Sequence, residues 1–323
     1  METVAEVLAN EFYQLGHQVD VVTTASLGGN ISEKDWPFVV HRNPRLWTYW
    51  NLAKKSDVIL HNCVSLKQLF PDLLYKNKVF VIHHTWYRLP DRRLNLSARL
   101  KRFISGYLHN CYISKAIQQD LGHTGKLIPN PYNNTLFKIR QGVDRNRSLV
   151  FLGRLVSDKG CMVLLEALKL AKDRYSRFEP DLTVIGEGPE KPVLESFTNK
   201  YLPNQVRFVG KLHGEQLAHT LNQHHMMVVP SVWEEPFGVV ALEGMACGCL
   251  VIGSEKGGLK DAIGSCGWTF PNGDAEALAN LLVKVWSDRT DWEEKYIAVP
   301  GHLFIHQPDQ IAKKYLDYFN TNV

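Results

Sequence analysis

Residues 230–252, PSVWEEPFGVVALEGMACGCLVI, carry the pattern that decides the fold expected of this chain. A strand ends at Pro230, a loop follows, an apolar helix pattern begins at Val239, and the next apolar run begins at Leu250. Strand, loop, helix and strand in this order form the repeating unit of a parallel sheet covered by helices. The stretch therefore predicts an α/β domain whose ligand site lies at the carboxyl ends of the strands.

The loop and the start of this helix carry the first candidate site residues. Backbone N–H groups at the start of a helix have no partner within it, so the turn at residues 236–240 favours a bound diphosphate. Gly238 has no Cβ and permits close approach of such a group. Glu235 and Glu243 lie eight positions apart, at most about 12 Å along a helix axis, a span that suits a nucleotide sugar held between them. Glu243 lies among apolar residues, where an unpaired carboxylate is costly.

The same alternation of apolar runs and helix patterns extends over the whole chain. It stops only at the polar segment KIRQGVDRNR, residues 138–147, which we expect to be an interdomain linker. We predict two doubly wound, Rossmann-like domains that face each other across a cleft: residues 1–138 for the acceptor and residues 139–306 for the donor. A last helical pattern, within residues 307–323, is expected to pack back on the first domain. Because the chain opens on a helix pattern, we expect either that the first strand of the N-terminal domain is missing or that the protein begins upstream of Met1.

A second group of candidates lies in LGRLVSDKG, residues 152–160, where a strand runs into a loop and then a helix expected from Lys159. Arg154 and Lys159 supply two cations, and Gly153 leaves the backbone room to turn. A diphosphate leaving group gains negative charge as its bond to a sugar breaks, so cations held there stabilise the transition state.

Composition excludes several classes of protein. A chain of 323 residues with 45% hydrophobic and 22% charged residues is an ordinary globular protein. A net charge of +4 lacks the basic stripe of a nucleic-acid binder, so no nucleic-acid partner is expected. The six cysteines lack the spacing of a zinc site or redox pair and are expected to be reduced thiols in a cytoplasmic protein. Neither a signal peptide nor a membrane span is evident.

Four ordered motifs, GRLVSDKG (153–160), IGEGP (185–189), VRFVGKL (206–212) and EPFGVVALE (235–243), resemble the family-4 retaining glycosyltransferases of the GT-B fold, or glycosyl transferases group 1. The resemblance implies that Arg154 and Lys159 hold the donor diphosphate, and that Glu243 holds the ribose. It assigns the transferred sugar to Glu235 and the adjoining backbone, and the base to the segment around Lys211. The implied catalytic residues are His84, Arg154, Lys159 and Glu235, and the implied donor-binding residues are Gly153, Gly186, Lys211, Leu212, Phe237, Gly238, Val239, Val240 and Glu243.

His84 matches the histidine that the family places near the anomeric carbon, and His83 is the alternative because the register allows one residue of freedom. Either histidine could instead cap the strand. The sequence departs from the family where its Gly-Gly loop would precede Met1, and where Pro131 replaces the glycine of a P-N-G motif. The first departure puts catalytic competence in question.

The resemblance implies a hexose transfer from a UDP-sugar, with UDP-glucose preferred, to a glycan or lipid-linked acceptor in polysaccharide biosynthesis. No D-x-D motif occurs in the sequence, so no metal cofactor is expected. Two alternatives remain open: a nucleotide-sugar hydrolase or epimerase on the same fold, and an inactive subunit that binds sugar nucleotides.

Residues 85–108 combine Trp86, Tyr87 and six cations with leucines. Such a stretch can bind an anionic or lipid-linked acceptor at the inner face of a membrane. A solvated helix face is the alternative interpretation.

Overall fold

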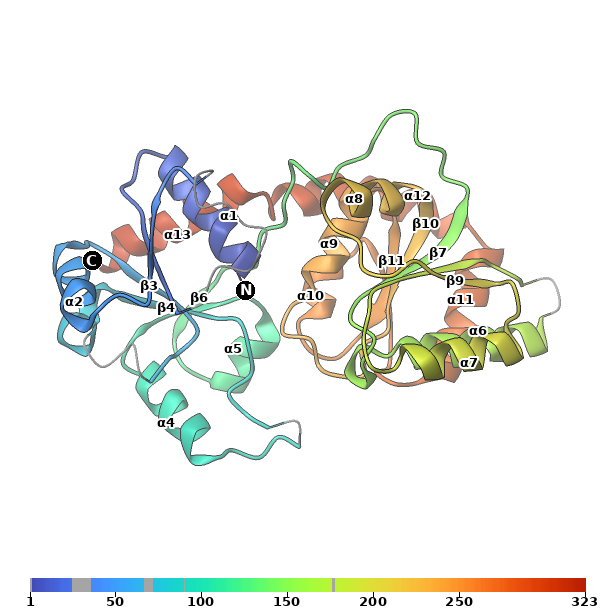
Figure 1. Cartoon of the computed structure of the whole chain (residues 1–323), viewed down its shortest axis with the longest axis horizontal. Coiled ribbons are helices and arrows are strands. Elements are labelled where there is room, and N and C mark those ends of the chain that lie inside the picture. The colour runs from blue at the N-terminus through green and yellow to red at the C-terminus, as the bar shows by residue number, and fades with distance from the viewer. Residues whose placement is uncertain (1, 25–35, 67–71, 90, 176–177) are drawn as a thin grey trace. The chain divides into compact units, whose positions relative to one another are not determined.

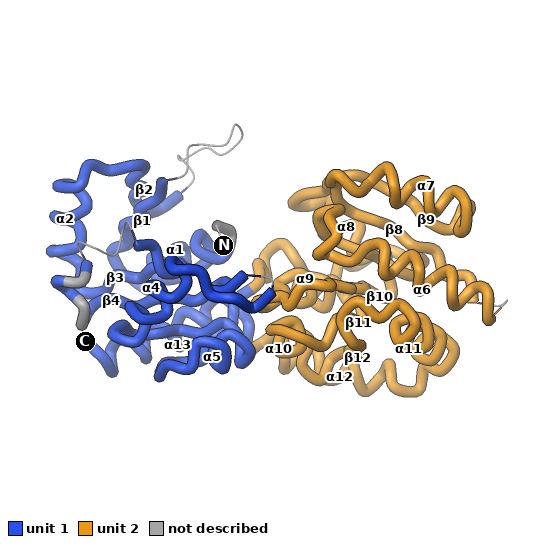
Figure 2. Tube along the Cα trace, turned by 90° about the horizontal axis from the view of Figure 1, so that it is seen from below, with its two compact units in different colours: residues 1–131, 306–323 blue, residues 132–305 orange. Residues whose placement is uncertain are grey.

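The computed structural model describes residues 2–24, 36–66, 72–89, 91–175 and 178–323, which form two compact units (Figures 1 and 2). Unit 1 comprises Met1–Pro131 and His306–Val323, and unit 2 comprises Tyr132–Ile305. The chain therefore leaves unit 1, builds all of unit 2, and returns to unit 1 for its last helix.

Unit 1 contains two separate parallel sheets. One consists of β1 (Asp20–Thr23) and β2 (Val39–Arg42), and the other has the order β3 (Ile59–Asn62), β4 (Val79–His83), β5 (His109–Tyr112) and β6 (Gly125–Leu127). The helices of this unit are α1 (Glu2–Gln14), α2 (Leu46–Lys55), η2 (Leu73–Lys78), α4 (Leu96–Ser105), α5 (Lys115–Leu121) and α13 (Pro308–Asn322).

One pocket of unit 1 is lined by residues of both sheets. It is lined by Asp20 and Val22 of β1, by residues 59–62 of β3, and by Tyr49 of α2 among others.

Unit 2 contains one parallel sheet with the order β12-β11-β10-β7-β8-β9. Its strands are β7 (Arg147–Leu152), β8 (Leu182–Ile185), β9 (Val206–Phe208), β10 (His224–Val229), β11 (Leu250–Ser254) and β12 (Gly267–Phe270). Its helices are η3 (Ser157–Lys159), α6 (Cys161–Arg174), α7 (Lys191–Tyr201), α8 (Gly214–Asn222), α9 (Val239–Ala246), α10 (Leu259–Ile263), α11 (Ala275–Ser287) and α12 (Thr290–Phe304). The strand order reverses direction between β7 and β10, so the topological switch point lies at the carboxyl ends of these two strands.

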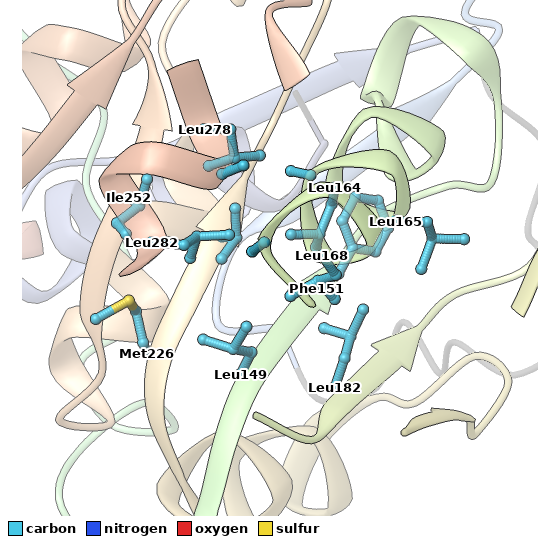
Figure 3. Close-up of a cluster of buried hydrophobic side chains, with 14 of the residues drawn as sticks. Leu149, Phe151, Leu164, Leu165, Leu168, Leu182, Met226, Ile252, Leu278 and Leu282 are labelled. Carbon is cyan, nitrogen blue, oxygen red and sulfur yellow. The ribbon is translucent and has the colours of Figure 1, made fainter. Parts of the chain in front are cut away.

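The core of unit 2 fixes these strand ends. Leu149 and Phe151 of β7 pack with Leu164 and Leu168 of α6, and Leu282 of α11 belongs to the same buried cluster (Figure 3). Strands covered by helices on both faces are apolar along their whole length, which explains the continuous apolar runs in the sequence.

The boundary between the units differs from the predicted one. The sequence placed a linker after residue 138, but the structure divides the chain between Pro131 and Tyr132 and again between Ile305 and His306. Asn222 of α8 holds the polar segment, because its Nδ2 donates to the Lys138 carbonyl at 3.0 Å and its Oδ1 accepts from the Arg140 N–H at 2.8 Å. These bonds use backbone groups, so the segment is anchored to unit 2 without any apolar periodicity.

The C-terminal helix α13 packs against α1 in unit 1. Phe12 of α1 contacts Tyr315 and Phe319, with ring centroids 6.4 and 6.1 Å apart. Ile311, Tyr315 and Phe319 are buried. The last helix in the sequence thus completes the core of the first unit.

Candidate functional site

The switch point of unit 2 joins the loop after β7 to the loop after β10. The Asp158 carbonyl accepts hydrogen bonds from the N–H groups of Val232 and Trp233, at 3.0 and 3.2 Å. Gly160 has a φ of +69°, and a Cβ added there would lie 1.9 Å from the Pro230 carbonyl oxygen. The two loops therefore touch along their backbones, which brings their side chains together.

A lysine and a glutamate meet at this junction. Lys159 Nζ lies 2.5 Å from Glu235 Oε1, and the Ser231 hydroxyl donates to the same oxygen at 2.7 Å. Glu235 Oε2 has no partner in the described part of the chain and remains available as an acceptor. Lys159 was expected to begin a helix, but it lies in the short 3-10 turn η3, and α6 begins only at Cys161. The left-handed Gly160 separates the two and turns Lys159 toward Glu235.

The backbone of Glu235 is held as well as its side chain. Its carbonyl accepts the N–H of Gly258 at 2.6 Å. At Gly257, φ is +88° and an added Cβ would lie 2.5 Å from the same carbonyl oxygen. Because both its backbone and its side chain are held, Glu235 is preorganised and can orient a ligand without a further entropic cost.

Helix α9 begins directly after this carboxylate. Its N-cap residue, Gly238, has a φ of +102°, and no side chain caps the first turn. An added Cβ at Gly238 would lie 2.5 Å from Leu259 Cδ1. Glycine is thus required by the backbone and by packing, and the uncapped N–H groups at the start of the helix form a favourable place for an anion.

Glu243 lies in the second turn of α9 and is partly buried. Burial raises the pKa of its carboxyl to about 7. Among the residues that the structure describes, none forms a hydrogen bond or ion pair with this carboxylate. A buried carboxyl without a partner costs free energy, which a ligand that donates hydrogen bonds would recover.

The remaining donor-side candidates follow the strands on the other side of the switch point. Arg154, after β7, is exposed and has no ion-pair partner within the described residues. The Gly186 N–H donates to the Gly210 carbonyl at 2.8 Å, and a Cβ at Gly186 would lie 1.8 Å from the Gly153 carbonyl oxygen. This close approach aligns the ends of β7, β8 and β9, and Lys211 and Leu212 follow directly after Gly210.

The two histidines lie in unit 1, at the end of β4. Both ring nitrogens of His83 are engaged, Nε2 with Asn110 Oδ1 at 2.8 Å and Nδ1 with the Tyr87 hydroxyl at 3.1 Å. Within the described ranges, the hydrogen bond of the His84 ring joins Nε2 to Asn62 Oδ1 at 3.1 Å. Burial lowers the pKa of both, to about 4 for His83 and about 3 for His84, so both are neutral at pH 7. The hydrogen bonds of His83 stabilise unit 1, whereas Nδ1 of His84 can bond to a ligand.

The sequence did not indicate every residue that shapes the site. Ser231 and the backbone of Asp158 and Gly258 were missed, although they hold the side chain or the loop of Glu235. Ser231 offered one signal, because it lies two residues after the end of β10, at the edge of a parallel sheet where ligands bind. Asp158 and Gly258 act through backbone groups, which are the same in nearly every residue type.

None of the described helices is long and apolar enough to cross a bilayer. No set of three or more His, Cys, Asp or Glu side chains in the described ranges is arranged to hold a metal ion.

A family model and several curated relatives match part of this chain. Residues 146–288 match the family model described as glycosyl transferases group 1. An uncharacterized glycosyltransferase of Methanocaldococcus jannaschii is 34% identical over 149 residues, which are 45% of this chain and 37% of the relative. The amylovoran biosynthesis glycosyltransferase AmsK of Erwinia amylovora is 29% identical over 171 residues, 50% of this chain and 41% of the relative. The chain thus covers less than half of these relatives.

Solved structures match over nearly the whole chain. HepE of Anabaena in complex with UDP superposes with a TM-score of 0.82 at 18% identity, covering 99% of this chain and 96% of the other. The same protein in complex with UDP-glucose gives a TM-score of 0.76 at 17% identity, covering 99% of this chain and 95% of the other. At this identity the likeness establishes the fold.

Proposed function

Residues 146–288 match the glycosyl transferases group 1 family model and the chain has the GT-B fold, and from this premise we propose that the protein transfers a hexose from a nucleoside diphosphate sugar to a hydroxyl acceptor. The proposed reaction retains the anomeric configuration. A UDP-sugar is the proposed donor, with UDP-glucose preferred, and a glycan or lipid-linked hydroxyl in polysaccharide biosynthesis is the proposed acceptor.

One observation carries the proposal: Lys159 and Glu235 are held together at the switch point, directly before the uncapped start of α9. A cation and open backbone N–H groups suit a diphosphate. A fixed carboxylate with one free oxygen suits sugar hydroxyls, which donate hydrogen bonds to it. The site therefore offers complementary groups to both parts of a nucleotide sugar.

Each residue has a proposed role. Lys159 and Arg154 stabilise the charge that develops on the diphosphate, and Glu235 Oε2 accepts from the sugar. Glu243 accepts from the ribose hydroxyls, and the segment after Gly210 holds the base. In unit 1, neutral His84 orients the transferred sugar near its anomeric carbon.

The proposed bond changes balance without a further reagent. The bond from the anomeric carbon to the diphosphate oxygen breaks, and a bond to the acceptor oxygen forms on the same face through an oxocarbenium-like state. The departing diphosphate takes the proton of the acceptor hydroxyl. We propose that no metal takes part, since the fixed cations supply the charge stabilisation.

A panel of nucleotide sugars, assayed for nucleotide release and for the sugar product, tests the proposal. Lys159→Ala and Glu243→Ala should each lower turnover at least about 100-fold, because each removes a preorganised electrostatic partner. Lys169→Ala and Glu276→Ala are matched controls, since both residues form exposed ion pairs remote from the switch point.

The products separate the alternatives. Formation of an α- or β-glycoside with the configuration of the donor supports a retaining transferase. Free sugar or an epimer as the sole product would support the hydrolase or epimerase alternative, and donor binding without turnover would support an inactive subunit. Near-normal rates in both site variants would refute the assignment.

A further inference from the structure

The outer face of α4 is apolar, and it is exposed. Leu96, Leu100, Phe103 and Tyr107 are 83%, 45%, 64% and 66% exposed. Their spacing of four, three and four residues places them on one stripe of a helix. Tyr107 lies just beyond the C-cap Gly106 and its ring packs against that of Phe103, with centroids 5.3 Å apart.

The opposite face of α4 makes the contacts that anchor the helix to unit 1. Ala98 and Ser105 are buried, and Arg102 Nη1 lies 2.6 Å from Asp120 Oδ2. The Asn95 side chain caps the first turn through the Ala98 N–H at 2.8 Å. The helix is therefore fully supported without its apolar stripe, which has no role in the core of unit 1.

Cations predominate along this helix, although Asp91, shortly before it, pairs with Arg93. The segment 92–107, RRLNLSARLKRFISGY, contains five cations and no acidic residue. Arg92 and Arg99 are exposed beside the stripe. Apolar side chains flanked by exposed cations on one helix face are the arrangement of an interfacial helix that binds anionic lipid.

We infer that α4 docks this protein on an anionic membrane surface, with Leu96, Leu100, Phe103 and Tyr107 entering the boundary between headgroups and acyl chains. The cations bind lipid headgroups at the rim. Charge favours a bilayer over an apolar protein groove as the occupant, because an exposed apolar stripe with the exposed cations Arg92 and Arg99 matches an apolar layer beneath anionic headgroups.

Sedimentation with vesicles of phosphatidylcholine, with and without phosphatidylglycerol, tests the inference and requires no turnover. The wild-type chain should bind the anionic vesicles at low salt. Leu96→Ser with Phe103→Ser should lower the partition coefficient at least about tenfold, because these side chains no longer enter the apolar layer. Arg92→Gln with Arg99→Gln should lower it about fivefold per charge, for anionic vesicles only.

Ile297→Ser with Phe304→Ser provides the matched control, since these residues of α12 are 73% and 53% exposed. Unchanged vesicle binding in this control supports the inference. Three outcomes would overturn it: no binding of the wild-type chain to anionic vesicles at low salt, an equal loss in the control, or a dimer of the wild-type chain that the Leu96→Ser and Phe103→Ser changes dissociate.

Discussion

Glu243 is the residue at which folding and ligand binding have opposite requirements. Burial raises the pKa of its carboxyl from 4.5 to about 7. A shift of this size corresponds to about 3 kcal/mol of free energy when the group is ionised in the folded protein. Glu243 carries this free-energy cost at the position where we propose that the ribose binds.

The pH dependence of stability should report this carboxyl. Between about pH 4.5 and pH 7 the folded state binds the proton of Glu243 more tightly than the unfolded state, so the stability it contributes is lost as the pH rises through this window. Urea unfolding from pH 5 to pH 8 should show the wild-type protein losing about 3 kcal/mol relative to Glu243→Gln, which has no such proton. Parallel curves for the two proteins would contradict the raised pKa.

Substitutions of His83 and His84 should have different effects, the first mainly on stability and the second mainly on turnover. His83→Ala removes two buried hydrogen bonds and leaves Asn110 Oδ1 without this partner, so it should lower the free energy of unfolding by about 2–4 kcal/mol. His84→Ala should cost less stability and lower turnover about 100-fold. Chemical denaturation and turnover assays on both variants check this, and a reversed pattern would identify His83 as the reactive residue.

At the scale of elements, the site depends on how closely the loops after β7 and β10 approach. The close contact of Gly160 with Pro230 and the bonds from the Asp158 carbonyl set that distance. The ion pair between Lys159 and Glu235 follows from it, because the two side chains come from different loops.

Gly160→Ala should therefore damage both stability and activity. A Cβ 1.9 Å from the Pro230 carbonyl oxygen forces the loops apart. Gly142→Ala is the matched control, since Gly142 has a similar φ of +75° but no atom within 4 Å of an added Cβ. Thermal unfolding should show at least about 2 kcal/mol more destabilisation for Gly160→Ala, with turnover lost. Equal effects of the two changes would mean that the clash is unimportant.

At the scale of the whole molecule, unit 1 depends on a helix from the far end of the chain. Tyr315 of α13 is buried against α1, and Phe319 contacts Phe80 of β4 with ring centroids 4.6 Å apart. Unit 1 is thus built from two segments separated by the whole of unit 2.

Tyr315→Ala should destabilise unit 1 selectively, by about 3–5 kcal/mol, because it leaves a large cavity in that core. Hydrogen exchange should show loss of protection in α1 and β4, while β7 and β10 keep theirs. Val323→Ala, at a residue 62% exposed, serves as the control. Equal loss of protection in both units would show that they unfold as one.

The sequence by itself determined the type of element at most positions of the parallel sheets. Buried strands such as β4 and β11 are apolar throughout, and glycines such as Gly160 and Gly238 mark turns that other residues adopt only with strain. It also identified Arg154, Lys159, Glu235 and Glu243 as candidates. These charged residues lie beside apolar strands and helices, where an unpaired charge is costly.

Only the tertiary structure decided which of these residues meet. It shows an ion pair between Lys159 and Glu235. Within the described residues, both ring nitrogens of His83 form hydrogen bonds, whereas only Nε2 of His84 does. The boundary between the units lies after Pro131. The structure also showed that the apolar stripe of α4 faces solvent rather than the core. Periodicity in a sequence reports which residues share a face, whereas contacts between distant loops depend on backbone geometry that residue types do not encode.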